Sequence, residues 1–304
     1  MRRVVLTLVV SLASPLLFAG AGAQIVKTTS PPATKSPVPV PSLPLPKSVP
    51  MIDGTPATID QIPFGHGETL TYNASWMGMA VGNATMKVES GATFEGKPAI
   101  HISGSAKSSR SFSMFFSIKD AAESWVDPDE LYSLGFVSDQ SEGSNQDYQK
   151  WILDYEKGVA HRYRVNRKKD GAIQKYDVDF PLTKSKVQDA ASMLYFYRAF
   201  DLKVGQTLTS DVYVSKDMWT LEVAVVGAEK GVKVKAGKFD CLKVEPRVLK
   251  NGKAQNKGKM TVWVSNDEHR VPVKIVSEVS LGKISAELVS YTQGVKDPEP
   301  KDTK

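Results

Sequence analysis

The sequence is poor in the residues that build disulfides and metal sites. Among its 304 residues there is one cysteine, Cys241, and there are four histidines. A single cysteine excludes an intramolecular disulfide and any site that needs paired cysteines. The histidines form none of the close pairs of zinc-binding motifs; they are His66, His101, His161 and His269. We therefore expect no metal site and no cofactor.

Catalytic signatures are also missing. The chain has no nucleophile elbow of the GxSxG type, no phosphate-binding glycine loop and no dinucleotide fingerprint. Its close acid pairs stand beside turn signals: Asp127 with Asp129, and Asp267 with Glu268. Carboxylates are common turn formers, so this role is favoured over the paired acids of a glycoside hydrolase. No catalytic residue is predicted, and a non-enzymatic protein is favoured.

The apolar run at residues 4–17 is too short, and too interrupted by serine and proline, for a stable membrane-spanning helix. It follows Arg2 and Arg3 and precedes the small residues 21–23, a pattern typical of a Sec-type signal peptide over residues 1–23. No cysteine stands directly after the expected cleavage point, so a lipid-modified N-terminus is not predicted. We expect a periplasmic or secreted protein.

A strong excess of one charge is absent as well. The formal net charge is +6, and loss of the predicted signal peptide, with its two arginines, lowers it to +4. So mild a basic excess, on an exported chain, does not indicate a nucleic-acid partner.

Two stretches outside the main domain are marked by composition. Residues 24–63 are dense in proline, which favours an extended linker over a packed core. Residues 293–304 are predicted to form a polar C-terminal tail.

What the chain does have, over residues 64–292, is regular alternation of apolar and polar residues. One side of the first predicted strand carries Leu70, Tyr72, Ala74 and Trp76. Glycine-bearing turns separate roughly fourteen to sixteen such stretches. The pattern predicts a mainly β fold: antiparallel curved sheets, or a partly closed barrel or sandwich, with one central amphipathic helix.

That helix is predicted over residues 187–200. Met193, Phe196, Tyr197 and Phe200 recur at three- and four-residue spacing and form one apolar face. Asp189 is placed to accept hydrogen bonds from first-turn amides. So apolar a face requires a partner, and the sheet is the expected one.

Three polar residues are predicted to be structural. Arg198 on the helix, if buried, needs a carboxylate from a strand, with Glu68 and Glu123 as candidates. We favour structural roles for Glu68, Tyr72 and Arg198 over a ligand-binding role. Cys241 lies in a strand-like stretch and is expected to be a buried thiol that packs as a small apolar group.

Several segments resemble the DUF3108 family of exported bacterial proteins. The opening stretch is similar to the family at Gly67, Glu68, Leu70, Tyr72, Trp76, Gly78, Gly82 and Ala84. The predicted helix resembles it at Asp189, Ser192, Tyr195 and Arg198, and the closing stretches GKFDCLKVEP, TVWVSNDEHRVPVKI and GKISAELVSY are also similar. The resemblance spans roughly residues 64–292. It implies an exported, mostly antiparallel β protein with no agreed activity.

The favoured hypothesis is a non-enzymatic exported envelope protein that binds a hydrophobic or amphiphilic component, a lipid or an acyl chain. The expected ligand site comprises Trp76, Met79, Met193, Phe196 and Tyr197, with Arg162 and Arg164 for an anionic head group. Alternatives are a module binding cell-wall or exopolysaccharide carbohydrate, a scaffold of an envelope complex and, less favoured, a glycoside hydrolase. Expected partners are an envelope lipid, lipoprotein or glycan, with peripheral membrane contact.

Overall fold

The computed structural model describes residues 44–214, 216–255, 258–279 and 281–295. In this part the chain forms seventeen strands and two short helices. The strands up to residue 181 are β1 (Met51–Ile52), β2 (Thr55–Pro56), β3 (Thr69–Trp76), β4 (Met79–Phe94), β5 (Lys97–Ser108), β6 (Ile118–Val126), β7 (Ser133–Glu142), β8 (Asn145–Asp154), β9 (Val159–Arg167) and β10 (Ile173–Pro181). The later strands are β11 (Thr207–Val214), β12 (Asp217–Val234), β13 (Gly237–Lys250), β14 (Lys253–Ala254), β15 (Met260–Ser265), β16 (Pro272–Glu278) and β17 (Lys283–Thr292). The helices are α2 (Arg110–Ser113) and α3 (Ser192–Arg198).

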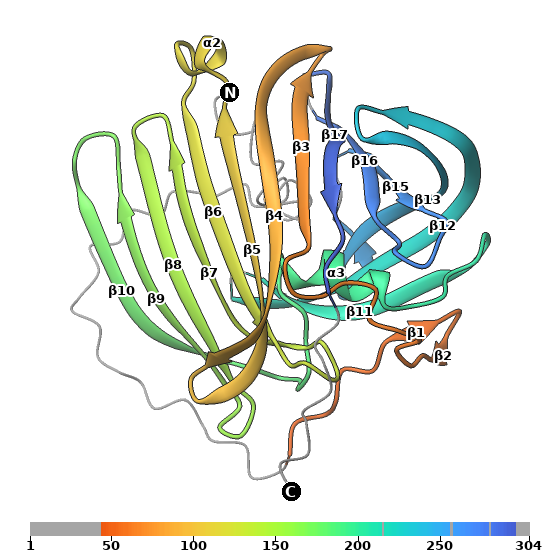
Figure 1. Ribbon diagram of the computed structural model, residues 1–304. Helices are drawn as coiled ribbons and strands as arrows, with labels where there is room; N and C mark the ends of the chain where they lie inside the picture. Colours follow the sequence, from red (N-terminus) through yellow and green to blue (C-terminus); the bar gives the residue numbers. More distant parts are fainter. Residues whose placement is uncertain (1–43, 215, 256–257, 280, 296–304) are drawn as a thin grey trace, which may run out of the picture.

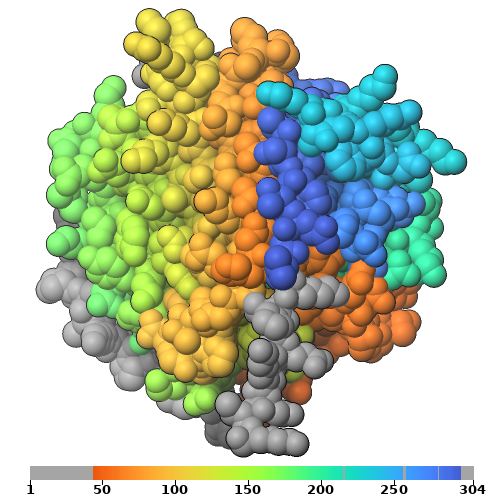
Figure 2. Space-filling model, viewed as in Figure 1, coloured from red at the N-terminus to blue at the C-terminus, as the bar shows by residue number. Residues whose placement is uncertain are grey.

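All ladders between these strands are antiparallel. Pairing runs from β10 back through consecutive strands to β3, then to β17, and on through β16, β15, β13 and β12 to β11 and β1. The first half, β3–β10, and the second half, β11–β17, are thus joined where β17 meets β3 (Figures 1 and 2). The two ends of this order form no ladder with each other among the described residues. The sheet therefore curls without closing, and the predicted mainly β, partly closed fold is confirmed.

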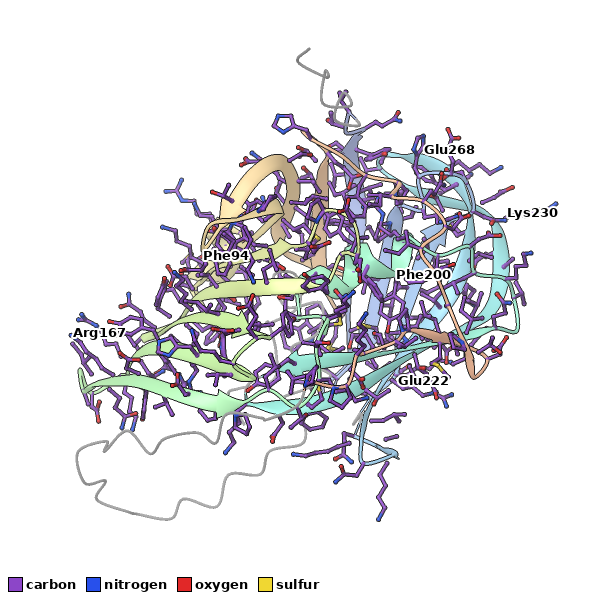
Figure 3. The ribbon with its side chains drawn as sticks, turned by 90° about the horizontal axis from the view of Figure 1, so that it is seen from below. Phe94, Arg167, Phe200, Glu222, Lys230 and Glu268 are labelled. Carbon is purple, nitrogen blue, oxygen red and sulfur yellow. The ribbon has the colours of Figure 1, made fainter. Side chains whose placement is uncertain are left out.

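Alternation along the strands places the core. In β3, Leu70, Tyr72 and Ala74 are buried, as their spacing predicts. The inner faces of both halves meet the apolar face of α3 in one main core. Phe200, just after α3, lies between the two sets of strands (Figure 3). The helix thus occupies part of the hollow that the curled sheet leaves.

The helix is shorter than predicted, because its first residues are engaged elsewhere. The carbonyl of Val187 accepts from the amide of Ser133, and Gln188 forms a bridge with Val212 of β11. The Asp189 carboxylate accepts from the amides of Ala191 and Ser192 at 2.7 and 2.9 Å, as expected, although the N-cap position of α3 is Ala191. Residues 187–188 are therefore held extended, and α3 begins at Ser192.

Residues 44–63 lie within the linker predicted from composition, but here they pack on the domain. β1 pairs with β11, and Ser48 is buried. The amide of Asp60 donates to the carbonyl of Ala199 at 2.8 Å. Prolines are compatible with this arrangement because very short edge strands need few amide donors. The predicted signal peptide, the linker up to residue 43 and the tail from residue 296 lie outside the described residues.

Candidate functional site

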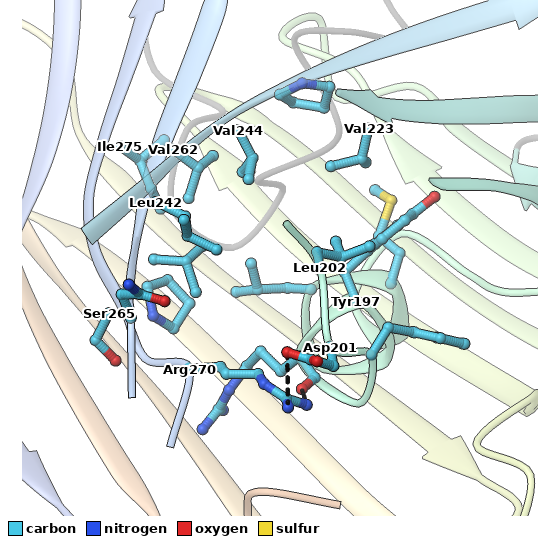
Figure 4. Close-up of a pocket in the computed structure, with 18 of the residues that line it drawn as sticks. Tyr197, Asp201, Leu202, Val223, Leu242, Val244, Val262, Ser265, Arg270 and Ile275 are labelled. Carbon is cyan, nitrogen blue, oxygen red and sulfur yellow. Dashed lines mark hydrogen bonds and ion pairs between the residues drawn. The ribbon is translucent and has the colours of Figure 1, made fainter. Parts of the chain in front are cut away.

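A cavity of about 490 Å³ lies between α3 and the strands of the second half. The sheet contributes Leu221, Val223, Leu242, Val244, Val262 and Ile275. The helix and the residues after it contribute Met193, Leu194, Tyr197, Phe200 and Leu202. Figure 4 shows the sheet's valines, leucine and isoleucine gathered on one side, opposite Leu202 and Tyr197. The larger part of the lining is thus apolar.

Polar side chains collect at one end of this cavity. Arg270 is central there: its Nη2 lies 2.7 Å from a carboxylate oxygen of Asp60 and 3.9 Å from one of Asp201. Its Nη1 donates to the carbonyl of Arg198 at 3.0 Å. Asp267 and Glu268 lie on the same rim. The lining thus holds four carboxylates and two guanidiniums, and one of these, Arg198, is neutralised by Glu68, so the rim has an acidic balance. Figure 4 shows Arg270 beside Asp201.

Tyr197 presents its ring to the cavity while its hydroxyl is engaged in the wall. The hydroxyl oxygen lies 2.9 Å from that of Ser210, and it donates to the carbonyl of Leu221 at 3.2 Å. Burial raises the pKa of Tyr197, and the hydrogen bond with Ser210 offsets this only in part. The residue therefore remains a neutral, apolar surface toward the cavity.

A buried ion pair supports the helix beneath the cavity. Arg198 donates from Nη1 and Nη2 to the two oxygens of Glu68 at 2.7 and 2.8 Å, and both side chains are almost fully buried. Burial by itself lowers the pKa of Arg198, but the hydrogen bonds and charge of Glu68 outweigh burial and raise it. Of the two predicted carboxylate partners, Glu68 is the one the structure supplies. Tyr72 lies in the same region and donates to the carbonyl of Pro272 at 2.8 Å.

The structure brings together two of the seven residues predicted to bind a ligand. Met193 and Tyr197 line the cavity, whereas Phe196 points from the same helix into the core and a separate hollow. Trp76 and Met79 flank the β3–β4 turn, away from the cavity lining. Trp76 donates to the carbonyl of Leu281 at 2.8 Å, and Met79 is 58% exposed.

The two predicted arginines are also apart from the cavity. Arg162 and Arg164 both lie on β9 of the first half, and neither is part of the lining. Arg164 binds Asp147 through Nε and Nη2 at 2.7 and 2.8 Å. A head group at this place would therefore belong to a different site from a chain held in the cavity.

The residues that sequence reasoning missed are the apolar strand positions of the cavity wall. Leu242, Val244 and Val262 belong to alternating stretches, which signals burial. Alternation does not say which buried face a helix covers and which part of that face stays open. Apart from this alternation, the sequence of the second-half strands did not indicate that these residues line a cavity.

The five tryptophans lie on five strands, and in the described part of the chain they share no groove. A hollow over β4–β8 is lined by Trp125, which stacks on Phe94 with ring centroids 4.7 Å apart. Trp151 is fully buried. Lys250 lies over the ring of Trp219, and Lys243 and Lys274 lie over that of Trp263. A row of exposed tryptophan rings for a glycan is not formed by the described residues.

Cys241 has the buried position expected of it. Burial, followed by the charges of Glu229, Asp267 and Asp240, raises the pKa of its thiol to about 12. Over the described ranges no three histidine, cysteine or carboxylate side chains gather as a metal site would require. In the same part of the chain, no helix is both long enough and apolar enough to cross a membrane.

A family model described as "Protein of unknown function (DUF3108)" matches residues 71–289, well over half of the chain. The chain belongs to the DUF3108 family. Its resemblance over the β3–β4 strands, α3 and the last strands is thereby confirmed. No curated protein matches this DUF3108 chain.

Solved structures are similar to this DUF3108 protein at low sequence identity. A beta-barrel-like protein of the DUF1849 domain from Brucella abortus aligns with a TM-score of 0.51 and 8% identity, over 76% of this chain and 99% of that chain. A protein described as exported, with a YmcC-like fold, from Bacteroides fragilis has a TM-score of 0.29 and 14% identity, over 78% of this chain and 100% of that one. The DUF1849 likeness shows a shared β-barrel-like architecture.

Proposed function

We propose that this DUF3108 protein is a non-enzymatic, exported envelope module that holds the acyl chain of an amphiphile in the cavity between α3 and the second half. The observation that carries the proposal is the cavity itself, about 490 Å³ with a mainly apolar lining. Pockets of roughly 300–1,000 Å³ with apolar walls and a few polar groups are typical of small-molecule sites. Each methylene moved from water into such a site contributes about 0.8 kcal/mol.

The rim supports a particular kind of head group. Its acidic balance, with Arg270 already shared between Asp60 and Asp201, disfavours a free carboxylate at the opening. A neutral, zwitterionic or cationic head group suits it better. A lipid or a lipoprotein chain joined through an ester or amide fits this description.

The test is the lipid content of protein purified without harsh detergent, read by mass spectrometry, together with binding of a fluorescent acyl probe. Val223→Phe fills the cavity wall, because Val223 is a buried lining residue. We expect it to weaken probe binding about tenfold, since the ring occupies volume that the chain needs.

Val226→Phe is the matched control. Val226 lies on the same strand, is 46% exposed and does not line the cavity. It should bind the probe as the parent protein does. Parent protein that carries no acyl compound and binds no probe contradicts the proposal, as does equal weakening by both substitutions.

A further inference from the structure

Arg162 is a half-buried cation whose hydrogen-bonding capacity is unused. Its guanidinium carbon lies 5.3 Å from the ring centroid of Trp151 and 4.9 Å from that of Phe180. Its Nε is buried and makes no hydrogen bond. Across the described residues Nη1 and Nη2 form no hydrogen bond or ion pair either, and they are not sealed from solvent as Nε is. The aromatic rings hold the guanidinium in place, while its N–H donors have no hydrogen-bond acceptor in the part of the chain described.

A second unsatisfied group reaches the same indole from another strand. Tyr213 of β11 is only 1% exposed, and its hydroxyl is buried without a hydrogen-bond partner. Its ring meets the Trp151 ring edge-on, with centroids 5.5 Å apart. A buried hydroxyl left unpaired is costly, and a bound acceptor removes that cost. Arg162 and Tyr213 are thus two donors packed on one residue.

The local charge is positive. The guanidinium of Arg164 is neutralised by Asp147, which it binds through two nitrogens. Asp217, which is close to Tyr213, pairs with Lys250 at 3.1 Å. Burial, followed by the charge of Arg164, lowers the pKa of Arg162. The charge of Asp147 opposes these two effects without cancelling them. Asp147 is bound to Arg164, so among the described residues Arg162 itself pairs with no carboxylate.

We propose that Arg162 and Tyr213 form a binding site for a phosphate group, either in a free phosphate compound or in the head group of an amphiphile. The planar guanidinium donates to two oxygens, as arginine commonly does with phosphate, and the tyrosine hydroxyl donates to the same group. Neither residue lines the apolar cavity, so this site stands or falls independently of acyl-chain binding.

The experiment is calorimetric titration of the full chain with inorganic phosphate, at an ionic strength held constant with chloride. We expect saturable binding. Arg162→Gln should raise the Kd at least about tenfold, because charge-assisted hydrogen bonds are lost. Tyr213→Phe should raise it about threefold and, without phosphate, should not lower the unfolding temperature, since the lost hydroxyl had no partner. Arg167→Gln is the matched control, because Arg167 is an exposed arginine on the same strand.

A second arm identifies the source of the phosphate. Vesicles of phosphatidylglycerol, compared with vesicles of phosphatidylcholine, are tested for retention of the parent protein and of Arg162→Gln. Retention on phosphatidylglycerol that depends on Arg162 assigns the phosphate to a lipid head group, and phosphate binding without retention assigns it to a free compound. Absence of saturable phosphate binding overturns the proposal, and so does an equal loss in Arg162→Gln and Arg167→Gln.

Discussion

Asp120 is a carboxyl group held in an environment that opposes its charge. It lies on β6 with 4% of its surface exposed, and its Oδ1 accepts from the amide of Ser141 at 2.9 Å. Burial raises the pKa of Asp120 from 3.8 to about 7, and the charges of Glu142 and Asp139 act in the same direction. The Ser141 hydrogen bond opposes these effects without cancelling them. At neutral pH this carboxyl therefore works against the fold.

The raised pKa of Asp120 sets the direction in which the stability of the fold changes with pH. Because the pKa of Asp120 is higher in the folded chain than in the unfolded one, the folded state binds the extra proton between about pH 4 and 7. Stability from this group is present below pH 4 and is lost as the pH rises to about 7. Asp120→Asn, which cannot ionise, should therefore gain stability relative to the parent protein over that window.

The measurement is the urea midpoint of both proteins from pH 4 to pH 8. Asp129→Asn is the control, because Asp129 is an exposed carboxylate in the turn after β6. It should follow the parent at every pH. A constant difference between Asp120→Asn and the parent from pH 4 to 8 would falsify the assignment.

Single residues also show what the sequence can and cannot predict. The Glu68–Arg198 pair was foreseeable, because an arginine on a buried helix face requires a carboxylate and few were available. Arg162 was predicted only together with Arg164, although Arg162 packs against three aromatic rings and Arg164 against one. Which of several neighbouring charged side chains becomes buried depends on how the strands pack in three dimensions. The spacing of residues in the sequence does not reveal this.

At the scale of elements, β4 and β5 show how close approach selects glycine. A Cβ at Gly82 would lie 2.4 Å from the carbonyl oxygen of Lys107 on β5, nearer than real contacts allow. At Gly104, on the facing strand, the nearest atom would be 3.9 Å away. A methyl group is therefore tolerated at Gly104 but not at Gly82, although both glycines belong to the same ladder.

We expect Gly82→Ala to lower the free energy of unfolding by about 1–3 kcal/mol, because the strands must shift apart. Gly104→Ala should raise it by about 0.4–1 kcal/mol, because it reduces the entropy of the unfolded chain without strain. Urea unfolding followed by circular dichroism measures both. Equal effects of the two substitutions would show that the strand approach at Gly82 is not as tight as described.

Element boundaries were predicted unevenly. Strands such as β3 follow directly from alternation, because their buried side chains repeat every second residue. The helix was placed correctly, but its start was set too early, since the carbonyl of Val187 and the bridge at Gln188 belong to strand-like contacts. Residues 44–63 were assigned to a linker. Composition does not reveal that the two-residue strand β1 pairs with β11 and with β2.

At the scale of the whole molecule, the joint between β17 and β3 unites segments about two hundred residues apart in sequence. Ala286 faces Ala74 across it, and Ala286 is fully buried. Since α3 packs against both halves in one core, neither half has a complete core of its own. The two halves should therefore unfold as one unit.

Ala286→Asp tests this coupling. A buried unpaired charge at the joint should cost about 3–5 kcal/mol. Hydrogen exchange should then increase in β8 of the first half as much as in β13 of the second. Ser290→Asp, on an exposed position of the same strand, should leave exchange unchanged. Faster exchange confined to the second half would show that the halves fold separately.

The outermost strand β10 has a consequence for how molecules meet one another. Among the described residues its ladder is with β9 alone, so it exposes one row of backbone donors and acceptors. Lys175, Asp177 and Asp179 alternate along it, and Pro181 ends it. Antiparallel self-pairing centred on Asp177 would set carboxylate against carboxylate, and the proline offers no amide. A sheet left open at this edge is thereby protected against growing, copy by copy, into an aggregate.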